Sequence, residues 1–302
     1  MSDLYPIVAV TGSSGAGTSA ASRIFNQMYQ REKINPVCVS GDSFHFYNRE
    51  EMQTAIQRAE AQGQRLSHFG PEGNLFEKLE RLFCEYSDQG TGLFRRYLHT
   101  EAEAQAYPGL KPGQFTPWEP VPEQSELLFY EGLHGGLVDG EINVARYVDL
   151  LIGITPIVNL EWIQKIHRDR NARGYSAEAS VDAILRRMHD YVHYIAPQFG
   201  QTHINFQRVP TVDTSNPFIA REIPTLDESF VVIHVRDTQK LHLDFPYLLS
   251  MIHDSFMSRR DTIVVPAGKA VLAADIIFTP VLTSIVTTAR RLRQRRLKRK
   301  QS

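Results

Sequence analysis

Two stretches of this chain carry residue types that handle phosphate groups. The first, VTGSSGAGTS at residues 10–19, places Gly12, Gly15 and Gly17 between an apolar run and an expected helix. A glycine loop at such a junction directs backbone N–H groups and the positive end of the helix at a phosphate. Two glycines at this spacing occur by chance about once in a chain of this length. The flanking strand and helix therefore carry the prediction, and a tight structural turn is the alternative.

The loop lacks the lysine that phosphate-binding loops normally carry, because Thr18 occupies its position. Ser19 stands where the hydroxyl that coordinates Mg²⁺ belongs. A threonine brings no charge, and loss of one preorganised stabiliser of transition-state charge costs roughly 3 kcal/mol. A kinase built on this loop needs a cation from elsewhere, whereas a protein that only senses nucleotide does not. The predicted ATP-binding residues are Gly12, Ser13, Ser14, Gly15, Ala16, Gly17, Thr18, Ser19 and Ala20.

The second stretch is VNLEWIQKIHRDRNARGYSAEA, in which charged residues recur at helical spacing. Lys165, Arg168 and Asp169 lie three and four residues apart, and Arg173 comes at the expected helix end, before Gly174. That spacing places the first three on one helix face. A surface helix with paired charges is the alternative. The arginine-rich turn RNARG favours a mobile lid whose guanidinium groups replace the loop lysine at the phosphates.

Carboxylates follow two of the expected strands. Asp42 comes directly after PVCVSG, and Glu131 closes LLFY. Sheets of this class bind ligands at the carboxyl ends of their strands. A helix N-cap is the alternative for Asp42, and a structural role is the alternative for Glu131. His45 and Arg49 follow Asp42 at a spacing that places both on one face of a helical segment, within reach of a sugar phosphate.

Apolar runs that alternate with helical patterns position these residues. Strands are expected in YPIVAVT, PVCVS, LLFYEG and VDLLIGIT, and helices over residues 19–32, 49–62, 158–171 and 177–195. This alternation predicts an α/β fold with a mainly parallel sheet and helices on both faces, while SFVVIHV and DTIVVP add an antiparallel edge. Residues 1–289 are interpreted as a single domain with an irregular excursion near 87–122, which holds the candidate strand LFRRYLH. Residues 290–302 are a basic tail.

Composition describes an ordinary soluble globular chain of 302 residues, 42% hydrophobic and 22% charged. Two cysteines are too few for a disulfide framework, no leader opens the chain, and no run reaches the roughly 18 consecutive apolar residues of a membrane span. We therefore expect a cytoplasmic protein without a membrane partner. The tail holds eight of the 33 basic residues, which leaves 25 basic against 34 acidic residues in the body. Because the body is acidic, we interpret the tail as a solvated helix end rather than as a site that binds nucleic acid or an anionic membrane.

The segment KIHRDRNARGYSAE, residues 165–178, resembles the signature of phosphoribulokinases at every fixed position: Lys, an aliphatic, any residue, Arg-Asp, three residues, Arg-Gly, any residue, Ser or Thr, any residue, Glu. The resemblance covers nearly the whole chain through GDSFH, LLFYEGLHG, INFQRVPTVDTSNPF and DFPYL. It is greatest to the bacterial branch, in which threonine in the loop is a family trait. It implies a P-loop kinase fold with a helical lid and ATP-dependent phosphorylation of the 1-hydroxyl of ribulose 5-phosphate, a step of Calvin cycle carbon fixation.

The resemblance also implies a role for each candidate residue. Asp42 is the catalytic base, Asp169 and Glu131 are further essential carboxylates, and Mg²⁺ is held by Ser19, Asp42 and Glu131. The residues implied for substrate binding are His45, Arg49, Lys165, Arg168, Arg173 and Arg187. Bacterial relatives form homo-octamers activated by NADH and inhibited by AMP. Arg31 and Arg259 match the arginines implicated there, whereas His234 stands where that branch often has arginine.

Two other functions stay open. A uridine-kinase-like nucleoside kinase has a similar Arg-Asp lid segment, but it needs an aromatic pocket for the base in place of His45 and Arg49. A non-catalytic nucleotide sensor, or an anion-binding protein that works through its basic tail, fits Thr18. The set Asp42, Glu131 and Asp169 argues against that second class.

Overall fold

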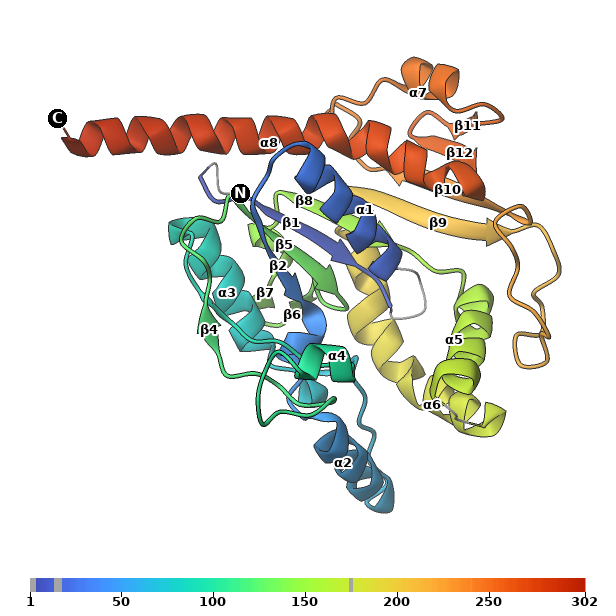
Figure 1. Ribbon diagram of the computed structural model, residues 1–302. Coiled ribbons are helices and arrows are strands. Elements are labelled where there is room, and N and C mark those ends of the chain that lie inside the picture. The colour runs from blue at the N-terminus through green and yellow to red at the C-terminus, as the bar shows by residue number, and fades with distance from the viewer. Residues whose placement is uncertain (1–3, 14–17, 174–175, 240, 302) are drawn as a thin grey trace.

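The centre of the molecule is a mixed sheet of eight strands (Figure 1). A computed structural model describes residues 4–13, 18–173, 176–239 and 241–301. The parallel strands are β2 (Pro36–Ser40), β5 (Leu127–Gly132), β1 (Ile7–Thr11), β8 (Leu150–Ile154) and β9 (Ile204–Pro210). An antiparallel edge follows, made of β10 (Ser229–Val235), β12 (Thr262–Pro266) and β11 (Phe256–Arg259). The predicted mainly parallel sheet with an antiparallel edge is confirmed, and its order is β11-β12-β10-β9-β8-β1-β5-β2.

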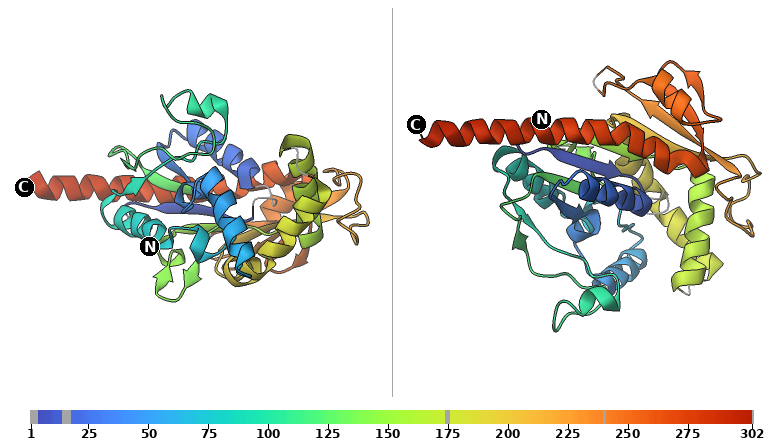
Figure 2. Two further views of the ribbon diagram at one scale, coloured as in Figure 1. Left: turned by 90° about the horizontal axis from the view of Figure 1, so that it is seen from below. Right: turned by 45° about the horizontal axis from the view of Figure 1, so that its top comes forward.

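Helices cover both faces of this sheet (Figures 1 and 2). One face packs against α1 (Thr18–Arg31) and α8 (Ala270–Gln301), and the other packs against α3 (Phe76–Gln89). Strand β1 shows why its sequence is apolar throughout. Val8 and Val10 belong to the first cluster of buried residues, whereas Ile7 and Ala9 belong to the second. Successive strand residues point to opposite faces, and both faces are buried here.

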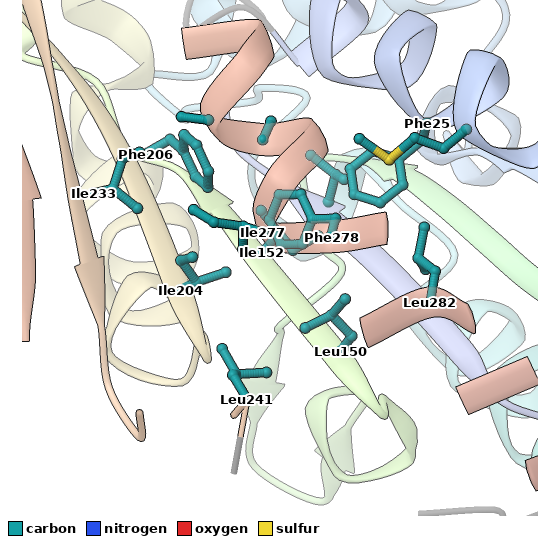
Figure 3. Packing of buried hydrophobic residues seen from close by; sticks show 14 of the residues in the cluster. Phe25, Leu150, Ile152, Ile204, Phe206, Ile233, Leu241, Ile277, Phe278 and Leu282 are labelled. Carbon is teal, nitrogen blue, oxygen red and sulfur yellow. The ribbon is translucent and has the colours of Figure 1, made fainter. Parts of the chain in front are cut away.

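The larger core lies between the sheet and the helices α1 and α8 (Figure 3). Phe278 of α8 packs between Phe25 of α1 and Phe206 of β9, with ring centroids 5.2 and 5.6 Å away. The first half of α8 is therefore a core helix. Its C-terminal end continues beyond the rest of the molecule (Figures 1 and 2).

Helix α8 bears on the expectation about membranes. The stretch Ala267–Arg299 is long and apolar enough to cross a membrane by length and composition alone. No run of roughly 18 consecutive apolar residues occurs in it, because Asp275, Thr279 and Pro280 interrupt the apolar stretch. The core helix of a soluble protein passes the same test, and Ala273, Ile277, Phe278 and Leu282 are buried against the sheet.

Smaller elements complete the fold. The helices are α2 (Arg49–Ala61), α4 (Glu101–Ala104), α5 (Val158–Arg173), α6 (Ala177–Asp190) and α7 (Phe245–Met251). Two short hairpins pair β3 (Leu93–Phe94) with β4 (Glu119–Pro120) and β6 (Val138–Asp139) with β7 (Ile142–Asn143). Helix α6 continues into a π-helical turn, Tyr191–Ile195. The expected strand LFRRYLH is a strand over its first two residues only.

Candidate active site

The carboxyl ends of three neighbouring strands bring the glycine loop and two carboxylates to one edge of the sheet. In the register, Glu131 of β5 lies between Val10 of β1 and Ser40 of β2. The glycine loop begins two residues after Val10, and Asp42 comes two residues after Ser40. Gly12 donates its N–H to the carbonyl of the residue that follows Glu131 (3.2 Å). This placement agrees with the expected convergence of loop and carboxylates.

The described part of the glycine loop fits a phosphate. Ser13 is fully buried, and its Oγ atom has no hydrogen-bond partner among the described residues. A buried hydroxyl without a partner, close to the start of α1, suits a phosphate oxygen. Four predicted ATP-binding residues lie outside the described residues: Ser14, Gly15, Ala16 and Gly17. The backbone of the next three opens α1, and their side chains also lie outside the description: Thr18, Ser19 and Ala20.

Asp42 lies in a 3-10 turn, Gly41–Phe44, directly after β2, and two imidazoles contact it. Its Oδ1 is 3.2 Å from Nε2 of His45, and its Oδ2 is 3.4 Å from Nε2 of His99. Burial by itself raises the pKa of Asp42. The hydrogen bond from His45 and the charges of the nearby imidazoles, including His68, outweigh burial and hold that pKa well below its usual range. Asp42 is therefore an ionised carboxylate at neutral pH.

Asn74 orients the ring of His45. Its Nδ2 donates to the carbonyls of His68 (2.9 Å) and Gly70 (2.7 Å), so its Oδ1 faces Nδ1 of His45 (2.9 Å). Both ring nitrogens of His45 thus face oxygen atoms. Both contacts are hydrogen bonds when both nitrogens carry protons, and in that form the ring places a positive charge beside Asp42.

His45 and Arg49 do not share a helical face, and the spacing argument for them is wrong. His45 has an extended backbone (φ −62°, ψ 144°) and forms an isolated bridge with Asn74, while α2 begins only at Arg49. The cause is the side chain of Asn48, which caps α2 and starts the helix after His45. Arg49 instead donates through Nη2 to the carbonyl of His99 (3.2 Å).

The segment near residues 87–122 contributes to this site. It supplies His99 to Asp42, and Arg95 donates to two carbonyls around the turn that carries Asp42. Sequence reasoning missed both residues, and it also missed Asn74. The signal was LFRRYLH, a stretch with two arginines, an aromatic residue and a histidine, but local periodicity does not reveal which distant segment it meets.

Helix α5 gathers two cations around Asp169. Lys165 Nζ forms an ion pair with Asp169 Oδ2, both side chains are buried, and Nε of Arg168 lies 3.7 Å from Asp169 Oδ1. Burial lowers the pKa of Lys165 to about 8, Arg187 lowers it as well, and Asp169 only partly offsets them. The expected placement of these residues on one helix face agrees with the contacts. Lys165 is a buried, paired cation rather than an exposed one.

Helices α5 and α6 lie together, and the lower end of α6 lies near α2 (Figure 1). The guanidinium of Arg187 lies 5.5 Å from the centre of the Phe69 ring. Its neighbour Arg186 forms an ion pair with Glu60, so α6 and α2 are in contact. The side chain of Arg173 lies outside the described residues.

The arginines expected at an effector site lie on separate elements. Arg31 ends α1 and pairs with Asp275 of α8 (2.8 Å). Arg259 ends β11, and both Arg259 and His234 lie opposite Thr262 of β12 in the register. Arg259 and His234 therefore flank one residue of the antiparallel edge, away from α1.

The donor set at the sheet edge suits Mg²⁺. No group of three or more His, Cys, Asp or Glu side chains in the described part of the chain is arranged to hold a metal ion by itself. Mg²⁺ usually takes one or two protein carboxylates and completes its shell with water and phosphate oxygens. Glu131 and Asp42 provide such hard oxygen ligands, so the residues fit a magnesium ion that accompanies a nucleotide.

Comparison with known proteins decides the family. Residues 7–215 match the model of the phosphoribulokinase / uridine kinase family. The chain belongs to this family. It is 57% identical over 295 residues to the chromosomal phosphoribulokinase of Cupriavidus necator, covering 97% of this chain and 100% of the relative. It is 55% identical over 288 residues to the phosphoribulokinase of Nitrobacter vulgaris, covering 95% and 98%.

A solved structure extends the likeness to the fold. The phosphoribulokinase from Rhodobacter spheroides matches with a TM-score of 0.87 and 51% identity, over 96% of this chain and all of that chain. The P-loop kinase fold expected from the signature at residues 165–178 is therefore confirmed.

Proposed function

We propose that this protein transfers the γ-phosphoryl group of ATP to the 1-hydroxyl of ribulose 5-phosphate and forms ribulose 1,5-bisphosphate, the Calvin cycle substrate for carbon fixation. The observation that carries the proposal is the sequence identity of 57% with a phosphoribulokinase, over 97% of this chain and the whole of that relative. The site supports it, since a glycine loop, strand-end carboxylates and a set of cations are the parts that phosphoryl transfer needs.

Asp42 is the general base in this proposal. Its carboxylate is ionised, and it accepts the proton of the sugar hydroxyl as that oxygen attacks the γ-phosphorus. His45 and His99 contact both of its oxygens and orient it. The same imidazoles occupy both carboxylate oxygens of Asp42 and disfavour a metal ion there. Among the three predicted magnesium ligands, we therefore propose Ser19 and Glu131 as the principal ones. Bound Mg²⁺ neutralises negative charge on the phosphates.

The remaining cations surround the transferring group and the sugar phosphate. We assign this role to His45, Arg49, Lys165, Arg168, Arg173 and Arg187. Lys165 is already opposed by Asp169, which keeps that carboxylate in place as the second essential acid. We propose that an arginine near the end of α5, Arg168 or Arg173, supplies the charge that Thr18 does not, because a guanidinium contacts a phosphate through two donors. Replacement of each by alanine, with turnover measured, tests which one acts.

A substrate panel tests the function directly. ADP release is measured with ATP and Mg²⁺ against ribulose 5-phosphate, other pentose phosphates, uridine and cytidine. We expect turnover with ribulose 5-phosphate and none with the nucleosides. Turnover with uridine alone supports the nucleoside kinase alternative, and ATP binding without turnover on any acceptor supports a nucleotide sensor.

The base assignment has its own test. We expect Asp42→Asn to lower turnover by about three orders of magnitude or more while ATP binding, followed by calorimetry, is retained, because an amide cannot accept the proton. Equal rates for the wild type and this variant remove Asp42 from the mechanism.

Assembly, regulation and location complete the proposal. We propose a cytoplasmic homo-octamer activated by NADH and inhibited by AMP through Arg31 and Arg259. In this structure Arg31 is held by Asp275, so an effector that binds Arg31 competes with that pair. Light scattering reports the assembly, and rates with and without each nucleotide report the regulation. Arg31→Ala is expected to abolish the NADH response and to leave the basal rate unchanged.

A further inference from the structure

Arg95 is a half-buried cation that donates to backbone carbonyls. Its Nε donates to the carbonyl of Ser43 (2.9 Å), and its Nη2 donates to the carbonyl of His45 (2.6 Å). The guanidinium lies 3.6 Å from the centre of the Phe115 ring and 4.8 Å from that of Trp118. Burial lowers the pKa of Arg95 to about 10, which nearby acidic charge offsets only in part. The side chain is thus held in one place by two hydrogen bonds and two aromatic rings.

These two carbonyls belong to the turn that carries the proposed base. Inside the turn the hydrogen bonds are long, at 3.2 Å from His45 N to the carbonyl of Asp42 and 3.3 Å from Asp42 N to Ser40 Oγ. Of the three successive carbonyls at residues 43–45, the middle one accepts from the N–H of Leu75 (2.8 Å). Arg95 binds the other two. The turn is therefore secured from outside, and Arg95 provides two of the three outside contacts at these carbonyls.

We propose that Arg95 is a positioning residue for phosphoryl transfer, which holds the turn Gly41–Phe44 and His45 so that the Asp42 carboxylate and the His45 ring meet. The proposal rests on the proposed function only for the reaction that is measured. Arg95 touches neither nucleotide nor sugar in this assignment and acts through the backbone of the turn. Displacement of a catalytic group by about 1 Å costs on the order of 100-fold in rate.

The neighbouring Arg96 is a matched control. It comes from the same segment, is exposed, and pairs at the surface with Glu119 (3.2 Å). The variants are Arg95→Met, which keeps the apolar stem and removes the fork of donors, Arg95→Lys, which keeps the charge but not the fork, and Arg96→Met. Each is assayed for kcat and for KM of ATP and of ribulose 5-phosphate.

We expect kcat to fall about 10- to 100-fold in Arg95→Met, with KM for ATP within about twofold of wild type, because the glycine loop is not part of the turn. Arg95→Lys is expected to lose nearly as much, whereas Arg96→Met keeps the wild-type kcat. In a further variant, Arg95→Ala, millimolar guanidinium is expected to restore part of the activity, because the ion carries the same donors and the same charge as the side chain that was removed. The proposal is overturned if kcat is unchanged in both Arg95→Met and Arg95→Lys. It is also overturned if KM for ATP rises by the same factor by which kcat falls.

Hydrogen exchange gives a readout that needs no turnover. Mass spectrometry of peptides that span residues 41–47 is expected to show faster exchange in both Arg95 variants and wild-type exchange in Arg96→Met, with peptides from β1 and β5 unchanged. Unchanged exchange at 41–47 contradicts the positioning role. If wild-type protein shows no turnover on ribulose 5-phosphate, the proposed function fails, and exchange at 41–47 still decides whether Arg95 holds the turn. If Arg95→Met does not fold, kcat and hydrogen exchange of Arg95→Lys test the proposal in its place.

Discussion

The rate of phosphoryl transfer is expected to fall above about pH 8, because Lys165 loses its proton there. Burial lowers its pKa from 10.5 to about 8. The groups that face it are Arg168, Asp169 and Glu161 on α5 and Arg187 on α6, and of these the carboxylate of Asp169 opposes the shift. With a pKa of 8, about 9% of Lys165 is charged at pH 9, whereas with a pKa of 10.5 about 97% is charged.

The sign follows from the role of Lys165. In the proposed role the protonated amine stabilises the transferring phosphoryl group, so the active form is the one that prevails below the pKa, and the rate is expected to decline about tenfold per pH unit above it. Initial rates at concentrations of both substrates well below KM report the free enzyme. Direct quantification of ADP from about pH 6.5 to about pH 10 avoids the pH dependence of coupling enzymes.

Two variants check that the alkaline limb belongs to Lys165. In Lys165→Arg the guanidinium keeps its charge, so the limb is expected to disappear although the overall rate is lower. Lys269→Arg changes a surface lysine that pairs with Asp254, and it is expected to keep the limb. A flat wild-type profile, or a limb that persists in Lys165→Arg, refutes the reasoning.

Two further substitutions test how the fold supports the site. Arg293 donates to three backbone carbonyls (2.6, 3.0 and 3.0 Å), so Arg293→Ala is expected to lower the free energy of unfolding in urea by about 2–4 kcal/mol. The exposed Arg299 makes no such contacts among the described residues, so Arg299→Ala is expected to stay within about 0.5 kcal/mol; equal losses would contradict this account of the tail. A Cβ on Gly41 meets Tyr130 Oη at 2.5 Å, so Gly41→Ala is expected to displace the turn of Asp42 and lower turnover about 10- to 100-fold. Gly268→Ala meets nothing within 4 Å and serves as its control in the same ADP assay, and wild-type turnover in Gly41→Ala would count against the tight turn.

Much of the fold was predictable because its signals are local. Strands β1, β2, β5 and β8 are short apolar runs that end at glycine or polar residues, and α1, α2, α5 and α6 follow from helical spacing or polar composition. Helix α3 received no prediction, although Phe76, Leu79, Phe83 and Tyr86 show helical periodicity. Helix α8 passes a length-and-composition test for a membrane span, but its first half is buried against the sheet, as in the core helix of a soluble protein.

The residues of the candidate site also fall into two groups: those that local sequence predicts and those that only tertiary contacts reveal. Asp42 and Glu131 were predicted because one follows the end of a strand and the other lies at a strand end, and parallel strands end at one edge. His99 and Arg95 were not, because they reach Asp42 and its turn only through contacts between segments far apart in the chain. A single sequence carries no periodic signal for such a meeting.

By itself the sequence determined the α/β alternation, the glycine loop without its lysine, and the signature KIHRDRNARGYSAE with its charged residues in helical register. Only the tertiary structure decided the electrostatic state of those groups. Lys165 is buried against Asp169 with a lowered pKa, Asp42 is held ionised between two imidazoles, and Arg95 donates to two carbonyls around the turn that carries Asp42. The reason is physical: residue type and spacing are local properties, whereas burial and the charges that surround a group depend on which distant segments pack against it.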